Sequence, residues 1–130
     1  MLDLKVNNTS PAEDLRDTVG DISDFEIFNN QVLVAIFLRP KVTKGGIYMP
    51  DTVREEDKYQ SKVGLVLALG PTAFQDANNQ WFQGIEAVKA GDWIVFKPSD
   101  GWGMTINGQM CRMLDDVNVR GRVIRPDLVW

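Results

Sequence analysis

Residues 31–38, with the sequence Gln-Val-Leu-Val-Ala-Ile-Phe-Leu, decide the fold of this chain of 130 residues. The stretch is apolar, rich in β-branched side chains and ended by Pro40, a pattern typical of a buried β-strand. Two further runs, residues 63–69 and 92–97, have the same character, and each borders on a glycine. The middle of the chain therefore predicts β-structure.

The C-terminal third predicts a hairpin and a last strand. Residues 104–106 and 109–114 flank Asn107-Gly108, and this dipeptide between two strands is a strong signal for a type I′ turn. A further run, residues 117–124, is expected to form the last strand. Five or six short strands separated by glycine and proline predict an all-β fold, either a small barrel or a sandwich.

The N-terminal segment differs from the rest of the chain in charge. Residues 1–28 carry seven acidic and two basic side chains, whereas the remainder is close to neutral. Within this segment, residues 10–13 (Ser-Pro-Ala-Glu) predict a helix start with a serine cap, proline at the first helical position and a capping box. A short helix is therefore expected over residues 11–19. Its expected role is packing against the body or a neighbouring subunit, and a dedicated partner-binding role is the alternative.

The composition excludes several classes of function. The chain has no histidine, so a Ser-His-Asp triad and a histidine-ligated metal site are excluded. Its single cysteine, Cys111, excludes an internal disulfide and is expected to be a core or half-buried thiol, with a reactive nucleophile as the less favoured alternative. The formal net charge of −4 argues against a nucleic-acid-binding face. No apolar stretch approaches the ~20 residues of a membrane span, and a cytoplasmic location is expected.

The acidic clusters do not predict catalysis. Asp115 and Asp116 with Asp100 could suggest a site for a hard cation, but adjacent residues of a strand point to opposite faces and do not share a ligand site. They are therefore expected to be solvated turn residues. Residues 55–57 (Glu-Glu-Asp) are expected to form a solvated loop face. Arg120, Arg122 and Arg125 could form a small RNA-binding patch together with Trp130, but three charges in an acidic chain make this a minor alternative. We therefore expect no enzyme, no metal site and no catalytic residue.

The connection between the first two strands, residues 39–61, is the most informative feature for function. The connection is polar almost throughout and contains a glycine pair, Gly45-Gly46. It nevertheless includes one apolar triplet, Ile47-Tyr48-Met49, between that pair and Pro50. Three apolar side chains in a solvated loop need a surface to cover them. They either fold back on the body as a lid or form a recognition segment that becomes ordered in a partner's apolar groove.

Several blocks of this sequence together resemble the co-chaperonins of the GroES type. The blocks are residues 32–34, 45–51, 64–71, 88–96 and 101–103, the last with the sequence Gly-Trp-Gly. They come in the order of that family and with nearly its spacing. Any single block is common in small barrels, but the ordered set is fairly specific.

The resemblance implies a small, mostly antiparallel GroES-like β-barrel that assembles into a homo-oligomeric ring, a heptamer. The ring caps an ATP-driven chaperonin ring of the GroEL type, which binds the nucleotide and encloses unfolded client proteins, so no cofactor is implied for this chain. In the family the glycine-hinged loop is mobile and its apolar triplet docks between two helices of the chaperonin's apical domain. By position, the implied chaperonin-binding residues here are Gly45, Gly46, Ile47, Tyr48, Met49 and Pro50.

The chain departs from the family pattern at several places. Tyr48 replaces a smaller aliphatic residue, which puts the fit to the usual bacterial partner in doubt. The connection 71–87, where the family places a roof turn, carries Phe74, Trp81 and Phe82. These aromatic side chains are expected to pack on the barrel, and the alternative is that they line the ceiling of the chamber.

The resulting domain description has three parts. Residues 1–28 form an acidic N-terminal extension, residues 29–119 form the barrel with its 39–61 and 71–87 connections, and residues 120–130 form a C-terminal tail. In the family the termini help to pair neighbouring subunits. These extensions are compatible with a virus-encoded member that works in a host cytoplasm. The alternative function is a non-chaperone ring-forming module, for example a virion structural subunit, on the same barrel.

Overall fold

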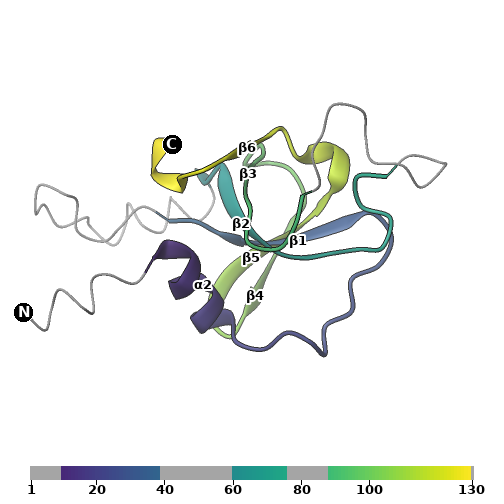
Figure 1. The fold of residues 1–130 in the computed structure, drawn as a ribbon, viewed down its shortest axis with the longest axis horizontal. Coiled ribbons are helices and arrows are strands. Elements are labelled where there is room, and N and C mark those ends of the chain that lie inside the picture. Colours follow the sequence, from purple (N-terminus) through teal and green to yellow (C-terminus); the bar gives the residue numbers. More distant parts are fainter. Residues whose placement is uncertain (1–9, 39–59, 76–87, 130) are drawn as a thin grey trace, which may run out of the picture.

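The protein is known from a computed structural model that describes residues 10–38, 60–75 and 88–129. These residues form one six-stranded sheet in which all neighbouring strands are antiparallel, in the order β4-β5-β1-β2-β3-β6. The strands are β1 Gln31–Ile36, β2 Val63–Leu69, β3 Trp93–Val95, β4 Trp102–Ile106, β5 Gln109–Asp115 and β6 Gly121–Val123. Figure 1 shows them crossing at the centre of a curled sheet, with one short helix at its side. The predicted small, GroES-like all-β fold is confirmed.

The hairpin between β4 and β5 has the predicted turn. Asn107 and Gly108 have positive φ angles of 50° and 85°, as a type I′ turn requires at both central residues. Ile106 and Gln109 pair directly on either side of the turn. The side chain of Asn107 adds a second role, because its Nδ2 donates to the carbonyl oxygen of Val19 at 2.6 Å.

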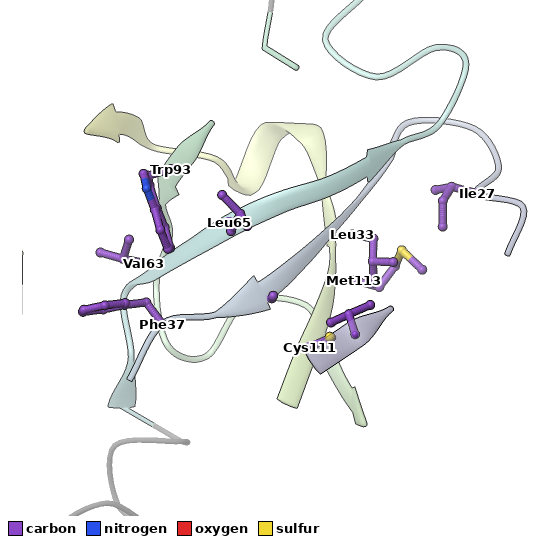
Figure 2. Close-up of a cluster of buried hydrophobic side chains, with 10 residues drawn as sticks. Ile27, Leu33, Phe37, Val63, Leu65, Trp93, Cys111 and Met113 are labelled. Carbon is purple, nitrogen blue, oxygen red and sulfur yellow. The ribbon is translucent and has the colours of Figure 1, made fainter. Parts of the chain in front are cut away.

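The sheet buries side chains on both of its faces. Along β1 and just beyond it, Leu33, Ala35 and Phe37 belong to one apolar cluster, whereas the alternate residues Val32, Val34 and Ile36 belong to another. Figure 2 shows the first cluster, whose members include Val63, Leu65, Trp93, Cys111 and Met113. Each of the two apolar faces must therefore be shielded from water by other parts of the chain. Phe74, Val88 and Phe96 contribute to the second cluster, and the N-terminal helix covers part of the first.

The helix α2, Pro11–Val19, begins and ends where the sequence predicts. The hydroxyl of Ser10 accepts a hydrogen bond from the backbone N–H of Glu13 at 3.1 Å, and Gly20 ends the helix with a φ angle of 76°. Val19 is buried in the first cluster, and Ala12 and Leu15 pack against it. The helix therefore packs against the body, the first of its two expected roles.

The structure corrects the expected last strand. Residues 116–118 form a 3-10 helix, η1 (Asp116–Asn118), and only Gly121–Val123 pair as a strand, β6, with β3. Because β6 lies beyond residue 119, the sheet continues past the predicted barrel boundary into the segment expected to be a tail. A second 3-10 helix, η2 (Pro126–Leu128), follows. Among the described residues there is no helix long and apolar enough to cross a membrane.

Candidate functional site

The six residues predicted to bind a chaperonin, Gly45, Gly46, Ile47, Tyr48, Met49 and Pro50, lie outside the described residues. The same holds for Trp81 and Phe82 of the predicted roof-like connection. What the structure does describe is the base from which the 39–59 connection leaves the sheet. The candidate site is therefore built from the residues that hold its two ends.

The two ends of this connection leave from adjacent antiparallel strands. Ile36, the last residue of β1, pairs with Gly64 at the start of β2, and the N–H of Phe37 donates to the carbonyl oxygen of Val63 at 3.0 Å. Gly64 suits this position because a side chain there would press on Val34, 3.0 Å away. A connection that starts and finishes on paired neighbours has its ends fixed in register.

A buried serine reinforces the base. Ser61 is 2% exposed, and its hydroxyl donates to the carbonyl oxygen of Phe37 at 2.7 Å. This bond joins Ser61, two residues before β2, to Phe37, the residue that follows β1. No local pattern predicts this bond, since Ser61 is 24 residues from Phe37 and serine is common in loops.

Aromatic packing stiffens the same end of the sheet. The rings of Phe37 and Trp93 meet edge to face, with centroids 5.7 Å apart and planes at 82°. Both side chains are buried, and Figure 2 shows them beside Val63 at one end of the cluster. An edge-to-face pair adds about 0.5–1.5 kcal/mol to the stabilisation from burial. The apolar base therefore gives the connection a rigid platform.

The start of the second long connection is also held, by a residue predicted to be solvated. Asp116 is 4% exposed, and its carboxylate accepts hydrogen bonds from Asn30 Nδ2 at 3.0 Å and from the N–H of Phe74 at 2.8 Å. The expectation of a solvated turn is wrong for Asp116, whereas Asp115 is exposed as expected but is the last residue of β5. A buried carboxylate needs such donors because it gives up its hydration. We call Asn30, Phe74 and Asp116 the Asp116 junction.

The junction explains an unusual backbone conformation. Phe74 has a φ angle of 62°, which is strained for an aromatic residue, and its side chain is 1% exposed in the second cluster. Burial of the ring and the bond to Asp116 together hold it there. Phe74 thus packs on the barrel, as expected, whereas the positions of its two aromatic partners in the prediction lie outside the described residues.

Cys111 is a buried thiol in the first cluster, 0% exposed. Burial raises its pKa to about 11, so the nucleophilic thiolate is scarce at neutral pH. In the described ranges, no three histidine, cysteine, aspartate or glutamate side chains gather as metal ligands would. The geometry of the described residues is that of a scaffold that holds the ends of two long connections.

Comparison with known proteins places the chain in a family. The family model for the chaperonin 10 kDa subunit matches residues 24–123. The chain is 36% identical over 101 residues to the co-chaperonin GroES of Caulobacter sp. (strain K31), covering 76% of this chain and 96% of that protein. It is 34% identical over 101 residues to the Caulobacter vibrioides protein of the same name, with the same coverage.

A third relative is co-chaperonin GroES 5 of Rhizobium meliloti, 32% identical over 97 residues, which cover 75% of this chain and 86% of that protein. The matched span begins after α2 and ends with β6, so it contains the whole six-stranded sheet. Fold, order of the sequence blocks and similarity to these relatives agree. The chain belongs to the chaperonin 10 kDa subunit family, the co-chaperonins of the GroES type.

Proposed function

We propose that this protein caps an ATP-driven chaperonin ring of the GroEL type and closes the chamber in which an unfolded protein folds. Membership of the co-chaperonin family supports the co-chaperonin role. The observation that carries the capping step is the apolar triplet Ile47-Tyr48-Met49 within a polar connection. The ends of that connection are held side by side through Phe37 and Ser61.

The energetics favour a weak contact that is repeated. Each apolar side chain of the triplet contributes about 1.5–3 kcal/mol if it is fully buried in a partner's groove. Ordering a long loop costs about 1–2 kcal/mol for each residue that becomes fixed, which offsets much of this gain. One loop therefore binds weakly, and a homo-oligomeric ring, a heptamer, binds tightly through avidity.

Release follows from the same balance. A chaperonin whose groove changes with its nucleotide state shifts the equilibrium by its difference in affinity for the triplet. The nucleotide is held by the chaperonin, so this chain needs neither a cofactor nor a catalytic residue. Tyr48 carries a hydroxyl that suits a groove open to water on one side. The cytoplasm, where such a partner is found, is the proposed location.

A nucleotide-dependent pull-down tests this function. Purified chaperonin is incubated with the tagged full-length protein in the presence of ATP, of ADP or of no nucleotide. We expect retention only with nucleotide, and the double variant Ile47→Ala/Met49→Ala loses more than about tenfold in apparent affinity, because each loop loses buried apolar area. The matched control is Val42→Ala/Val53→Ala, which removes apolar groups from the same connection outside the triplet and leaves retention unchanged.

The alternative, a ring-forming or virion structural module without a chaperonin partner, gives a different result. Binding that ignores nucleotide, or wild-type binding by the double variant, contradicts the capping proposal and favours that module. NMR adds a direct test of mechanism. The signals of residues 45–50 are expected to be narrow in the free protein and to broaden when chaperonin and nucleotide are added.

A further inference from the structure

The turn between β4 and β5 carries a pair of residues whose reactivity the proposed function does not use. Asn107 and Gly108 are exposed at this turn, and Asn107 is the only asparagine in the chain that a glycine follows. Asparagine in this setting readily loses its side-chain amide, because glycine has no β-carbon to keep its backbone nitrogen away from the neighbouring Cγ. A β-carbon built at Gly108 would meet nothing within 4 Å, so this side of the turn is open to water.

The side chain of Asn107 is also the link between this turn and the helix α2. Its Nδ2 donates to the carbonyl oxygen of Val19 at 2.6 Å and lies 3.6 Å from the position that a β-carbon would take at Gly20. Val19 is the last residue of α2, and a carbonyl in the last turn of a helix has no partner within the helix. Figure 1 shows α2 beside the strands of this hairpin. The amide that completes the helix end is thus the group that the reaction removes.

We propose that Asn107 is a site of spontaneous deamidation and that this modification releases α2 from the sheet. In the first step the backbone nitrogen of Gly108 gives up its proton and bonds to Cγ of Asn107, the bond from Cγ to Nδ2 breaks, ammonia leaves and an imide ring closes. Water then opens the ring. Opening at Cγ leaves an aspartate at position 107, and opening at the main-chain carbonyl leaves an isoaspartate. Water is the only co-reactant, and nothing is oxidised or reduced.

Docking of the helix controls how fast this reaction runs. In the observed conformation the amide nitrogen of Asn107 faces Val19, so Cγ meets the nitrogen of Gly108 only after the bond to Val19 has broken. The reaction therefore proceeds from those molecules in which this end of α2 has opened, a local opening of the kind that also precedes amide hydrogen exchange. A docked helix protects Asn107, and a loosened helix exposes it.

The product cannot restore the contact with the helix. An ionised carboxylate only accepts hydrogen bonds, so it faces the carbonyl oxygen of Val19 without a donor. Its negative charge also lies at the C-terminal end of α2, where the helix itself carries a partial negative charge. An isoaspartate adds one more atom to the main chain of a turn whose two central residues both have positive φ angles. The release is therefore one-way.

Release of α2 leaves the family sheet in place. The family match begins at residue 24, after the helix, and contains all six strands. What the release uncovers is the part of the first cluster that Ala12, Leu15 and Val19 cover. The inference goes beyond the proposed function and does not depend on it, because the predicted chaperonin-binding residues belong to another connection.

Peptide mapping by mass spectrometry tests the modification. The folded full-length protein is kept in mildly alkaline buffer and sampled over time, and isoaspartate is detected with a protein isoaspartyl methyltransferase. We expect Asn107 to be converted while Asn118, which Val119 follows, keeps its amide. Conversion is expected to be at least about tenfold faster in Val19→Ala than in the wild type, because the loss of burial loosens the helix. The matched control Asp17→Ala, at an exposed position of the same helix, is expected to keep the wild-type rate.

Hydrogen exchange measures the consequence for the helix. Asn107→Asp places the carboxylate of the product at the turn, whereas Asn107→Gly keeps a turn-forming residue that has neither amide nor charge. The N–H of Gly20 donates to the carbonyl oxygen of Arg16 at 2.8 Å and reports on the helix end. We expect it to exchange about tenfold faster in Asn107→Asp than in the wild type, and less fast in Asn107→Gly. Amides of β1 are expected to keep their wild-type exchange in both variants, because the sheet remains folded.

Three results overturn the inference. The first is that Asn107 keeps its amide for as long as Asn118 does. The second is that Val19→Ala is converted no faster than Asp17→Ala. The third is that Asn107→Asp leaves the exchange of Gly20 at the wild-type rate, or that it speeds exchange in β1 equally, since the whole fold is then destabilised and the helix is not released on its own.

Discussion

At the scale of single residues, Asp116 links distant parts of the chain through one buried side chain. Its carboxylate joins the segment before β1 to the segment after β2, through Asn30 and the backbone of Phe74. Its own N–H donates to the carbonyl oxygen of Asn30 at 3.1 Å. Three stretches of chain that are distant in sequence thus meet at one buried group.

We expect Asp116→Ala to lower the free energy of unfolding by about 2–3 kcal/mol, because it leaves buried donors without an acceptor. Asp116→Asn keeps one acceptor oxygen and is expected to lose about half as much. Urea denaturation followed by tryptophan fluorescence measures both. Asp127→Asn, at an exposed acidic residue, is the control and should stay within about 0.5 kcal/mol of the wild type. A wild-type midpoint for Asp116→Ala would contradict the role of the junction.

Cys111 gives a second prediction at this scale. Because burial raises its pKa to about 11, the thiol is expected to resist a thiol reagent such as dithionitrobenzoate in the native protein at pH 8. In guanidinium chloride it should react at once and in full. The measurement is the absorbance of the released thiolate against time. Fast labelling of the native protein would show that the first cluster opens to solvent.

At the scale of elements, α2 is an addition to the family sheet that has become part of its core. The helix precedes the matched span, yet Val19 is 1% exposed among residues of β1, β2 and β5. The hairpin supports it, because Asn107 bonds the last carbonyl oxygen of the helix. The capping residues therefore define the helix locally, and contacts with strands that are distant in the sequence anchor it to the sheet.

Docking of α2 is tested by Val19→Ala. Removing two buried methyl groups is expected to lower the free energy of unfolding by about 2 kcal/mol, through lost burial and the cavity left behind. The control on the same helix is the exposed Asp17→Ala, expected to remain within about 0.5 kcal/mol of the wild type. Thermal and urea denaturation give the values. Equal stability of the two variants would mean that the helix is not anchored through Val19.

Prediction from sequence succeeded where the signals are local. The cap at Ser10, the stop at Gly20 and the turn at Asn107 act within a few residues, so the helix and the hairpin follow from neighbouring side chains. It failed where the partner is remote. Asp116 lies 86 residues from Asn30 and 42 from Phe74, and no local pattern shows that a fold will bring them together.

The expected strand over residues 117–124 failed for a related reason. Val117 is β-branched and begins the expected strand, yet it lies in η1 and is 65% exposed. The N–H of Val119 donates to the carbonyl oxygen of Asp116 at 3.1 Å, which closes the 3-10 turn that the buried carboxylate begins. The candidate binding residues 45–50 could be predicted only as a pattern, an apolar triplet between glycines and proline, and they remain a prediction.

At the scale of the whole molecule, Asp92 helps to hold the edge strand β6 in the sheet. Its carboxylate accepts from Lys89 Nζ at 3.2 Å and from Arg122 Nη1 at 3.0 Å, so it links β6 to the turn before β3. Burial by itself raises the pKa of Asp92, but the hydrogen bonds from Lys89 and Arg122 outweigh it, and the pKa lies below its usual value of 3.8.

This depressed pKa predicts a pH dependence of stability. The stabilisation is fully present above the unfolded-state pKa of 3.8 and is lost as the pH falls through the lower folded-state pKa. Asp92→Asn is therefore expected to cost about 1–2 kcal/mol at pH 7. The difference from the wild type should shrink below pH 3.8. Urea denaturation at a series of pH values measures it, and a difference that does not change with pH would contradict the assignment.

The burial of β1 on both faces has a consequence for the synthesis of this protein on the ribosome. Gln31 of β1 pairs with Asp115 of β5, which is 84 residues later in the chain, so β1 cannot complete its pairing until β5 has been synthesised. Until then the nascent chain carries a two-sided apolar strand with an open edge, the feature that invites aggregation. We therefore expect the nascent chain to be prone to aggregation until β5 has been synthesised and has paired with β1.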